Sequence, residues 1–403
     1  MATIDKSLPN TMTEVEIPGE EEIVQAKEEA VEEISSDGKT EIEMDEEGGA
    51  TINFDPGEVN PEGGEDHDAN LADFLEDNVL DPLASELMEK YTNYKQSRQE
   101  WADSYREGLN LLGFKYVTRT EPFRGASSVT HPVLAEAVTQ FQAQAYKELL
   151  PADGPVRTQI MGDANVAKEE QSKRVKDFMN YQIMDQMKEY EPEFDQMLFY
   201  LPLSGSTFKK VYYDDLLGRA VSKFIPAEDL VVPYSATSLE DAEAVIHVIR
   251  MSPNDLRKQQ INGFYRDIDL GEPPVQEDKL KQKELELEGI TSNGTEDMYT
   301  VLEMHVDVDL EGHEDVNPED GEPTGIKLPY IITIDEANEK VLSIRRNYAP
   351  EDPLKKKKDY FVHFKFLPGL GFYGLGLIHM IGGLSRTATV ALRQLLDAGT
   401  LAN

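Results

Sequence analysis

The sequence contains no cysteine among its 403 residues. This absence excludes a disulfide framework, a thiolate metal site and a cysteine nucleophile. No apolar run approaches the roughly 18 residues that span a bilayer. The first residues, MATIDKSLPNTMTEVEIPGEEE, also lack the basic and apolar regions of a signal peptide. We therefore expect a soluble protein that does not enter a membrane.

Aromatic side chains are almost missing from residues 1–72, where Phe54 is the single one. The same stretch holds 22 acidic residues against three lysines, a net charge of −19 out of −39 for the whole chain. So few apolar side chains cannot offset the entropy lost on ordering. We predict that residues 1–72 form a disordered acidic tail, with an acidic helix over residues 20–34 as the alternative. The acidity also argues against tight wrapping of nucleic acid, because phosphate binding needs Lys and Arg.

Residues 73–204 show the periodicity of α-helices. Apolar residues recur three or four positions apart over residues 87–112 and again over residues 134–149. Two further helices are expected over residues 166–188 and from Pro192 onwards. We interpret this part of the chain as a helical bundle.

The hydrophobic period changes from 3.6 to 2 in residues 205–368. Short β-branched and aromatic runs alternate there with turn sequences. The runs are STFKKVYYD, GRAVSKFIP, DLVVPYS, AEAVIHVIRM, YTVLEMHVDVDL, LPYIITID, KVLSIRRNY and YFVHFKFLP. They predict an antiparallel β unit and an α+β fold. Residues 271–297 are polar and charged, and we interpret them as a mobile insertion that could hold a solvated helix.

Several short motifs resemble functional sites but fit plainer structures better. Residues 307–312, DVDLEG, resemble the start of a calcium loop, yet Pro318 stands where a bidentate Glu is required. We interpret them as the acidic end of a hairpin. Residues 355–358 are the only lysine cluster and fit a solvated turn. The histidines show no metal-ligand spacing. We expect no catalytic residue, no metal site and no cofactor.

Residues 369–374, GLGFYG, match the dinucleotide motif G-x-G-x-x-G with Gly369, Gly371 and Gly374. In a dinucleotide fold the helix after the motif leads to a second parallel strand with an acidic residue. Asp397 lies at a suitable distance, but within the helical run. The preceding strands also resemble hairpins. We conclude that the sequence around the motif does not form a dinucleotide-binding fold. We keep a nucleotide-binding enzyme as an alternative.

The helix that follows this motif has two different faces. One face carries the apolar residues Leu377, Ile381, Leu384, Ala388, Ala391 and Leu395, spaced as in a helix-bundle seam. The other carries Arg386, Thr389, Arg393 and Asp397. Gly382 and Gly383 each cost about 1 kcal/mol relative to alanine in a helix, which indicates close approach of another backbone. We predict that residues 369–403 are a tightly packed hinge, with candidates Gly369, Gly371, Gly374, Gly382 and Gly383, followed by a packing helix.

Long blocks of the sequence resemble the portal, or head-to-tail connector, proteins of short-tailed bacteriophages. The blocks include PFRGASSVTHPVLAEAVTQFQAQAYKELLPADGPVRTQ, RVKDFMNYQIMDQMKEYEPEFDQMLFYLPLSGSTFKKVYYD and FIPAEDLVVPYSATSLEDAEAVIHVIRMSPNDLRKQQINGFYRDI. The terminal block GFYGLGLIHMIGGLSRTATVALRQLLDAGTLAN fits as well. The likeness extends from about residue 71 to residue 403, without distinctive coverage of residues 271–297.

The resemblance implies a ring of twelve subunits in the virion, at one vertex of the capsid, assembled in the host cytoplasm. Double-stranded DNA would pass through its channel without sequence preference. The implied partners are the terminase motor, capsid and scaffolding proteins, and tail adaptors. Residues 73–368 would form the wing, and the terminal helix would begin the stem. Subunit-interface candidates are Leu377, Ile381, Leu384, Arg386 and Arg393.

The resemblance also limits what can be carried over to this chain. Family members are considerably longer, so we expect an N-terminal fragment. No catalytic residue is carried over, because the portal is not the packaging ATPase. A different class also stays open, in which an acidic protein-binding or DNA-mimic module would hold basic partners.

Overall fold

The computed structural model describes residues 41–44, 50–53, 67–114, 121–163, 165–214, 217–273, 279–287, 298–316, 323–369 and 371–402. The chain divides into two compact units, Met1–Asp66 and His67–Asn403. The described part of the first unit is an antiparallel pair of β1 (Glu41–Met44) and β2 (Ala50–Asn53). This pair differs from the wholly disordered tail expected. The strand sequences EIEM and ATIN flank a Gly-Gly pair, a pattern that favours a hairpin. The alternative helix over residues 20–34 lies outside the described residues.

The second unit begins earlier than the boundary expected at residue 72. Leu71 and Ala72, in the short helix η1 (Leu71–Asp73), are fully buried. Asn70 ties this segment to the edge of a sheet: its Nδ2 donates to Leu342 O (3.3 Å), and its Oδ1 accepts from Ile344 N (2.9 Å). Residues 67–72 therefore belong to the folded body, although their composition resembles that of the tail.

Helices occupy the first part of the second unit, in agreement with the periodicity. They are α2 (Asp77–Ser97), α3 (Gln99–Leu109), α4 (Val133–Leu149), α5 (Val166–Tyr181) and α6 (Tyr190–Ser204). Later helices are α7 (Pro253–Ile261), α8 (Lys279–Leu287) and α9 (Leu377–Ala402). The run of residues 87–112, whose periodicity predicted one helix, is interrupted between α2 and α3 by Arg98, at φ −100° and ψ 9°.

Two antiparallel sheets follow, where the sequence predicted one β unit. The three-stranded sheet has the order β10-β3-β4, with β3 (Ser206–Asp214), β4 (Arg219–Pro226) and β10 (Phe361–Lys365). The five-stranded sheet has the order β5-β6-β7-β8-β9. Its strands are β5 (Leu230–Val231), β6 (Ala244–Met251), β7 (Tyr299–Val308), β8 (Leu328–Asp335) and β9 (Lys340–Arg346). The α+β class is confirmed.

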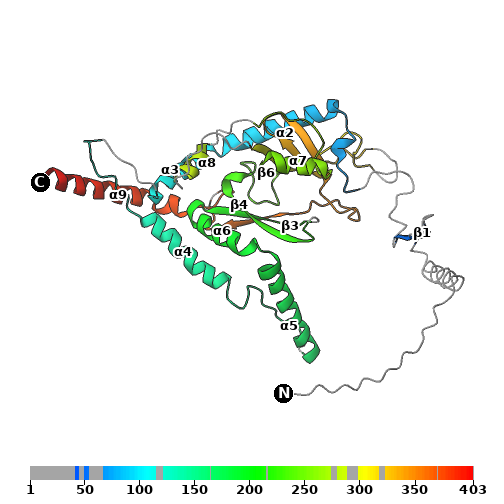
Figure 1. Ribbon diagram of the computed structural model, residues 1–403, viewed down its shortest axis with the longest axis horizontal. Coiled ribbons are helices and arrows are strands. Elements are labelled where there is room, and N and C mark those ends of the chain that lie inside the picture. The colour runs from blue at the N-terminus through cyan, green and yellow to red at the C-terminus, as the bar shows by residue number, and fades with distance from the viewer. Residues whose placement is uncertain are drawn as a thin grey trace, which may run out of the picture. The chain divides into compact units, whose positions relative to one another are not determined.

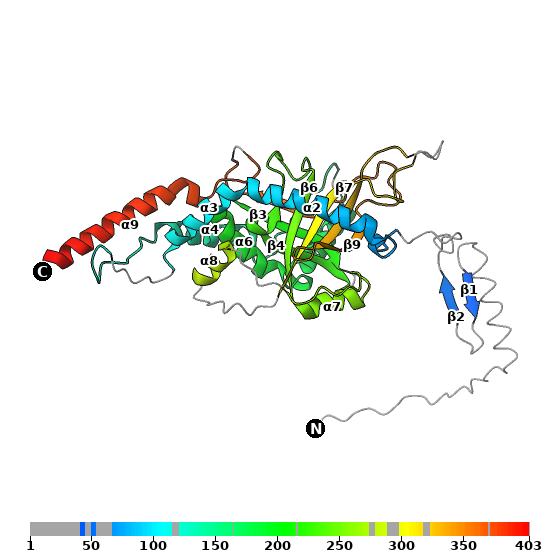
Figure 2. The same ribbon diagram turned by 90° about the horizontal axis from the view of Figure 1, so that it is seen from above.

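Helices cover both sheets. Helix α2 lies across one face of the five-stranded sheet (Figures 1 and 2), where Leu80, Leu87 and Tyr91 share a core with Ile332 and Ile344. The opposite face packs on α7 and the segment after it, through Leu256, Tyr265 and Leu270 among others. Helix α6 covers the three-stranded sheet.

A further core joins α3, α4 and α9. Tyr105, Leu134, Leu203 and Ile378 are buried there together, so the beginning of α9 is part of the body. Beyond that point α9 extends away from the body (Figure 1). Gly108 of α3 lies under Ile378, and a Cβ at this glycine would come within 2.3 Å of the isoleucine side chain. No helix among the described residues has the length and apolar character needed to cross a membrane.

Helix α8 lies inside the insertion expected over residues 271–297. We expected any helix there to be solvated, but Glu284 is only 8% exposed and Leu287 packs against the α3–α4–α9 core. The described part of the insertion is therefore docked on the body. Residues 274–278 and 288–297 lie outside the described residues.

Candidate functional site

The glycine segment, residues 369–376, connects β10 to α9 and packs against the end of α6. A Cβ added to Gly374 would lie 2.4 Å from Gly205 O, and one added to Gly376 would lie 2.3 Å from Leu203 O. Two backbones meet here at a separation that a side chain would prevent. Gly205 itself has φ +91°, which favours glycine, and ends α6.

Three consecutive backbone N–H groups of this segment, at residues 374–376, have partners within the chain. Gly374 N donates to Ser206 Oγ (2.7 Å), and Leu375 N donates to Leu367 O (2.8 Å). Gly376 N donates to His379 Nδ1 (3.1 Å). A phosphate loop must offer free N–H groups to its ligand. The preceding strand β10 is antiparallel to its neighbour β3. This geometry matches a packed connection between a strand and a helix, and it is unlike a dinucleotide-binding turn.

His363 of β10 stabilises the same connection from within the sheet. Its Nε2 lies 3.1 Å from Ser206 Oγ, and its ring stacks against both Phe208 and Phe372, which also stack on each other. Because Ser206 Oγ accepts from Gly374 N, its proton is available for Nε2. Burial, with a smaller effect of the charge on Lys365, lowers the pKa of His363 to about 3. The histidine is thus a neutral hydrogen-bond acceptor within the sheet.

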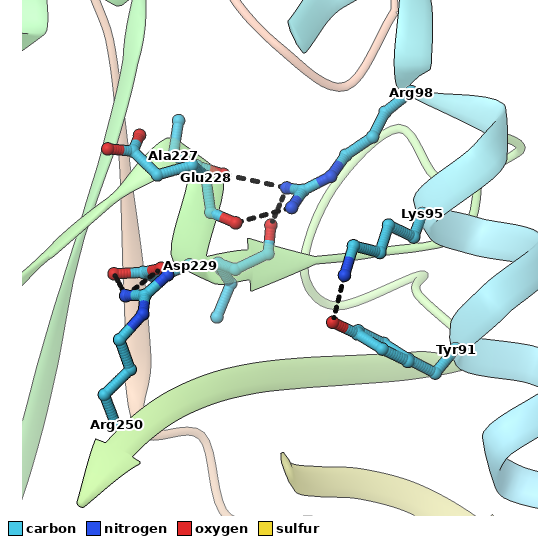
Figure 3. A network of polar contacts seen from close by, with 8 residues as sticks. Tyr91, Lys95, Arg98, Ala227, Glu228, Asp229 and Arg250 are labelled. Atoms are coloured by element: carbon cyan, nitrogen blue, oxygen red, sulfur yellow. Dashed lines mark hydrogen bonds and ion pairs between the residues drawn. The ribbon is translucent and has the colours of Figure 1, made fainter. Parts of the chain in front are cut away.

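Arg98 links the glycine segment to α2 and to the short helix η4 (Ala227–Asp229). Its guanidinium donates to Ala227 O (2.9 Å), to Leu230 O (2.8 Å) and to the carbonyl of Glu228 (Figure 3). It also donates to the Tyr373 hydroxyl (3.2 Å), which in turn donates to Leu230 O (3.1 Å). The Tyr373 ring stacks on Trp101 with centroids 4.8 Å apart. Five donors in a fixed fork make arginine suited to binding several carbonyls at once.

The face of α9 that contacts its own chain is narrow, and its distal half is polar. Its buried residues are Ile378, Gly382, Ser385 and Thr389. Towards its end, α9 binds the loop of residues 126–131: His131 N donates to Thr389 Oγ1 (3.1 Å), and Ser127 N donates to Asp397 Oδ1 (2.6 Å). Arg393 Nε donates to Val129 O (2.7 Å).

The apolar face of α9 is largely exposed, so the packing seam predicted from its spacing is not filled within this chain. Leu377 and Ile381 are half-buried against the α3–α4–α9 core, but Leu384 is 67% exposed and Leu395 is 71% exposed. Met380, Val390, Leu396 and Leu401, at other positions around the helix, are also exposed. The polar residues Thr389, Arg393 and Asp397, assigned to the other face, make the contacts instead. Arg386 is exposed. We call Met380, Leu384, Val390, Leu395, Leu396 and Leu401 the α9 apolar surface.

The remaining hinge candidates differ in their surroundings. A Cβ on Gly369 would lie 2.8 Å from Tyr373 O, and one on Gly382 would lie 3.5 Å from Leu111 Cδ1. Gly371 and Gly383 have no atom within 4 Å of the added Cβ. Close packing therefore requires glycine at residues 369, 374 and 376, whereas residues 371 and 383 have room for a side chain.

A buried charge cluster joins the two sheets. Lys210 Nζ of β3 lies 2.6 Å from both carboxylate oxygens of Glu303 on β7, and His305 Nε2 lies 2.8 Å from Glu303 Oε1. Burial alone would raise the pKa of Glu303, but Lys210 and His305 outweigh burial and hold it well below its ordinary value. His247 on β6 lies beside this cluster, and burial lowers its pKa to about 3. The Lys210–Glu303 ion pair therefore links the three-stranded sheet to the five-stranded sheet.

The structure also shows where the calcium-loop-like motif and the lysine cluster lie. Residues 307–312 complete β7 and the turn after it, and the described residues hold no group of three His, Cys, Asp or Glu suited to a metal ion. The lysine cluster is less solvated than expected. Lys355 pairs with Asp315, and Lys357 Nζ donates to Leu239 O (3.3 Å) and Glu240 O (3.0 Å).

Sequence reasoning missed Arg98, Tyr373 and the contact face of α9. The sequence around Arg98 gives no sign of its role, because most of the atoms it binds are main-chain oxygens far along the chain. The contact face of α9 had a signal, since Ile378, Gly382, Ser385 and Thr389 repeat at intervals of four and three. No protein-family model matches the chain, and no curated protein matches it.

Proposed function

We propose that the chain is a subunit of a viral portal, the ring at a capsid vertex through which DNA is packaged and ejected. The α9 apolar surface is the observation that carries the proposal. Helix α9 binds its own chain through a narrow face and leaves several large apolar side chains in solvent. Exposed apolar patches of this kind are typical of association surfaces. In a ring, this surface would pack against the neighbouring subunit through a heterologous contact.

The order of the secondary-structure elements and the net charge of the chain support this proposal. A helical layer, antiparallel sheets and then a long terminal helix are the elements that the resemblance to phage portals implies, in the same order. The net charge of −39 suits a conduit, because an acidic wall repels phosphate and does not grip DNA. In this role the ring would bind the terminase motor and tail adaptors, and capsid and scaffolding proteins would surround it.

The glycine segment favours this proposal over a nucleotide-binding enzyme. Its N–H groups at residues 374–376 are hydrogen-bonded to Ser206, Leu367 and His379. Ligand phosphates would have to displace these bonds and the close backbone packing at Gly205. Titration of the purified chain with NAD or ATP should therefore give no saturable binding at micromolar concentrations.

Electron microscopy and mass photometry of the purified chain test the proposal. We expect heterogeneous oligomers at high salt, where repulsion between acidic subunits is screened. The double variant Leu384→Glu and Leu395→Glu should remain monomeric and keep the melting temperature of the parent. Met161→Glu is the matched control, because Met161 is 84% exposed in the loop between α4 and α5, and it should assemble normally. A chain that stays monomeric at every salt concentration would contradict the proposal.

A further inference from the structure

Helix α5 extends away from the two sheets and has no buried residue (Figure 1). One side of the helix binds the preceding segment through polar groups. Val156 N donates to Asn180 Oδ1 (2.9 Å), and Ser172 Oγ donates to Thr158 Oγ1 (2.8 Å). Most helices in proteins are stabilised by packing of an apolar face, and isolated helices near the length of α5 are marginal in water. Within its own chain, α5 lacks this packing.

The other side of α5 is an exposed surface that combines apolar and basic residues. Gln171, Arg174, Val175 and Phe178 have the spacing of residues that share one face of a helix. All four are exposed, Val175 at 43% and Phe178 at 59%. The Arg174 side chain has no hydrogen bond or ion pair with the rest of the described chain. We call these four residues the α5 outer face.

The groove between α4 and α6 has a complementary character. Its volume is about 530 Å³, and its lining includes Ala143, Tyr146 and Lys147 of α4 and Glu191 and Asp195 of α6. Glu191 accepts a hydrogen bond from the Tyr146 hydroxyl. Neither Glu191 nor Asp195 forms an ion pair with a described residue. The groove thus offers two carboxylates against one lysine, beside an aromatic ring.

Charge favours a second copy of this chain as the partner of the α5 outer face. The chain carries −39, but residues 151–189 hold seven acidic and six basic residues, so copies repel one another least there. The groove has carboxylates without a cation, and α5 has Arg174 without an acid. Each copy carries both surfaces, so the contact between copies is heterologous.

We propose that α5 of one copy docks in the α4–α6 groove of the next copy. Glu191 and Asp195 are four residues apart on one face of α6, and Arg174 would lie between their carboxylates. Val175 and Phe178 would cover the α4 side of the groove. This contact is separate from the α9 apolar surface, and it rests on the proposed function because the ring supplies the second copy.

The absence of cysteine allows a direct test by disulfide cross-linking. Val175→Cys places a thiol on the α5 outer face, and Ala143→Cys places one in the groove, both at exposed positions. Oxidation of an equal mixture at about 0.15 M ionic strength should link one copy of each variant, because a disulfide needs Cα atoms within about 7 Å. Lys173→Cys is the matched control, since it is exposed on the other side of α5 and should not link to Ala143→Cys.

Charge reversal tests the pairing of Arg174 with the groove. Arg174→Glu in the Val175→Cys chain should slow formation of the mixed dimer about fivefold, because attraction to the carboxylates becomes repulsion. Glu191→Arg in the Ala143→Cys chain should then restore the parental rate. Circular dichroism should show the same helix content in all variants. An unchanged rate with Arg174→Glu would overturn the proposal.

Light scattering of the unoxidised mixture separates this contact from the proposed ring. If the average mass rises with salt and no mixed dimer forms, α5 docking is wrong and the proposed function is unaffected. A mixed dimer without any rise in mass would support α5 docking and contradict assembly through α9. Linked dimers of Val175→Cys alone, formed as fast as the mixed dimer, would show that α5 packs on α5 and would also overturn the proposal.

Discussion

The guanidinium of Arg98 donates a 3.2 Å hydrogen bond to the hydroxyl of Tyr373, across 275 positions of sequence. This contact joins the break between α2 and α3 to the segment that leads into α9. The same guanidinium binds three main-chain carbonyls at η4 and β5. One side chain therefore fixes the relative positions of three elements that the sequence places far apart.

Replacing Arg98 with lysine should destabilise the protein strongly. A lysine ammonium cannot reproduce the arginine fork, so buried carbonyls lose their donor. Hydrogen bonds to a charged group contribute about 1.5–3 kcal/mol each, and we expect a loss of about 2–4 kcal/mol in the free energy of unfolding. Urea unfolding followed by circular dichroism measures this loss. Arg257→Lys is the matched control, because Arg257 pairs with the exposed Asp267, and its effect should stay within about 0.5 kcal/mol.

Alanine substitutions within the glycine segment should have opposite outcomes. Gly374→Ala places a Cβ 2.4 Å from the carbonyl oxygen of Gly205, so one backbone must move, and we expect a fall in thermal stability of several degrees. Gly371→Ala meets no atom within 4 Å and should be tolerated. Differential scanning calorimetry of the two variants distinguishes packing from generic loop flexibility. Equal damage from both would show that the close backbone contact is not what requires glycine.

The Lys210–Glu303 pair should make stability depend on acid. The pKa of Glu303 is lowered in the folded state, so its contribution is present above the unfolded value of about 4.5 and is lost as the pH falls below it. The melting temperatures of the parent and of Glu303→Gln should therefore differ most above about pH 5, and the difference should shrink steadily as the pH falls from about 4.5 to 3. Glu86→Gln provides a control, because Glu86 forms an exposed pair with Lys90. A constant difference across this range would contradict the assignment.

Salt should promote self-association if the α9 apolar surface binds a neighbouring subunit. Repulsion between chains of −39 charge opposes contact in dilute buffer, and screening removes much of it at high salt. Light scattering at a fixed protein concentration should show a rising average mass between about 20 mM and 500 mM salt. A mass that falls with salt would indicate that ion pairs, and not apolar side chains, hold the subunits together.

The sequence located most elements of this fold because their signals are local. Pro132 opens α4 and the apolar spacing ends at Leu149, as expected from periodicity alone. The strand runs were also recognised from alternation and turn residues. The division into two sheets was not, because β10 pairs with β3 across about 150 positions of chain, and alternation carries no information on partners.

The contact face of α9 shows a second limit of sequence reasoning. Apolar spacing predicts a buried stripe, but it does not distinguish packing within a chain from packing between chains. Leu384 and Leu395 fit the seam by spacing and are exposed, whereas Thr389 and Arg393 bind the loop of residues 126–131. Gly382 and Ser385 are buried on the same face as Thr389, and their spacing was the available clue.

The bond between Gly374 and Ser206 also has a consequence for the order of folding during synthesis. Ser206 and Phe208 leave the ribosome long before their partners, since Gly374 follows Ser206 by 168 residues. Until β10 and Phe372 emerge, one edge of β3 has no partner strand, and the core around Phe208 lacks the rings of His363 and Phe372. Contacts this distant in sequence form slowly, and uncovered strand edges attract other chains. Nascent chains stalled before residue 361 should therefore depend on chaperones more than the finished protein does.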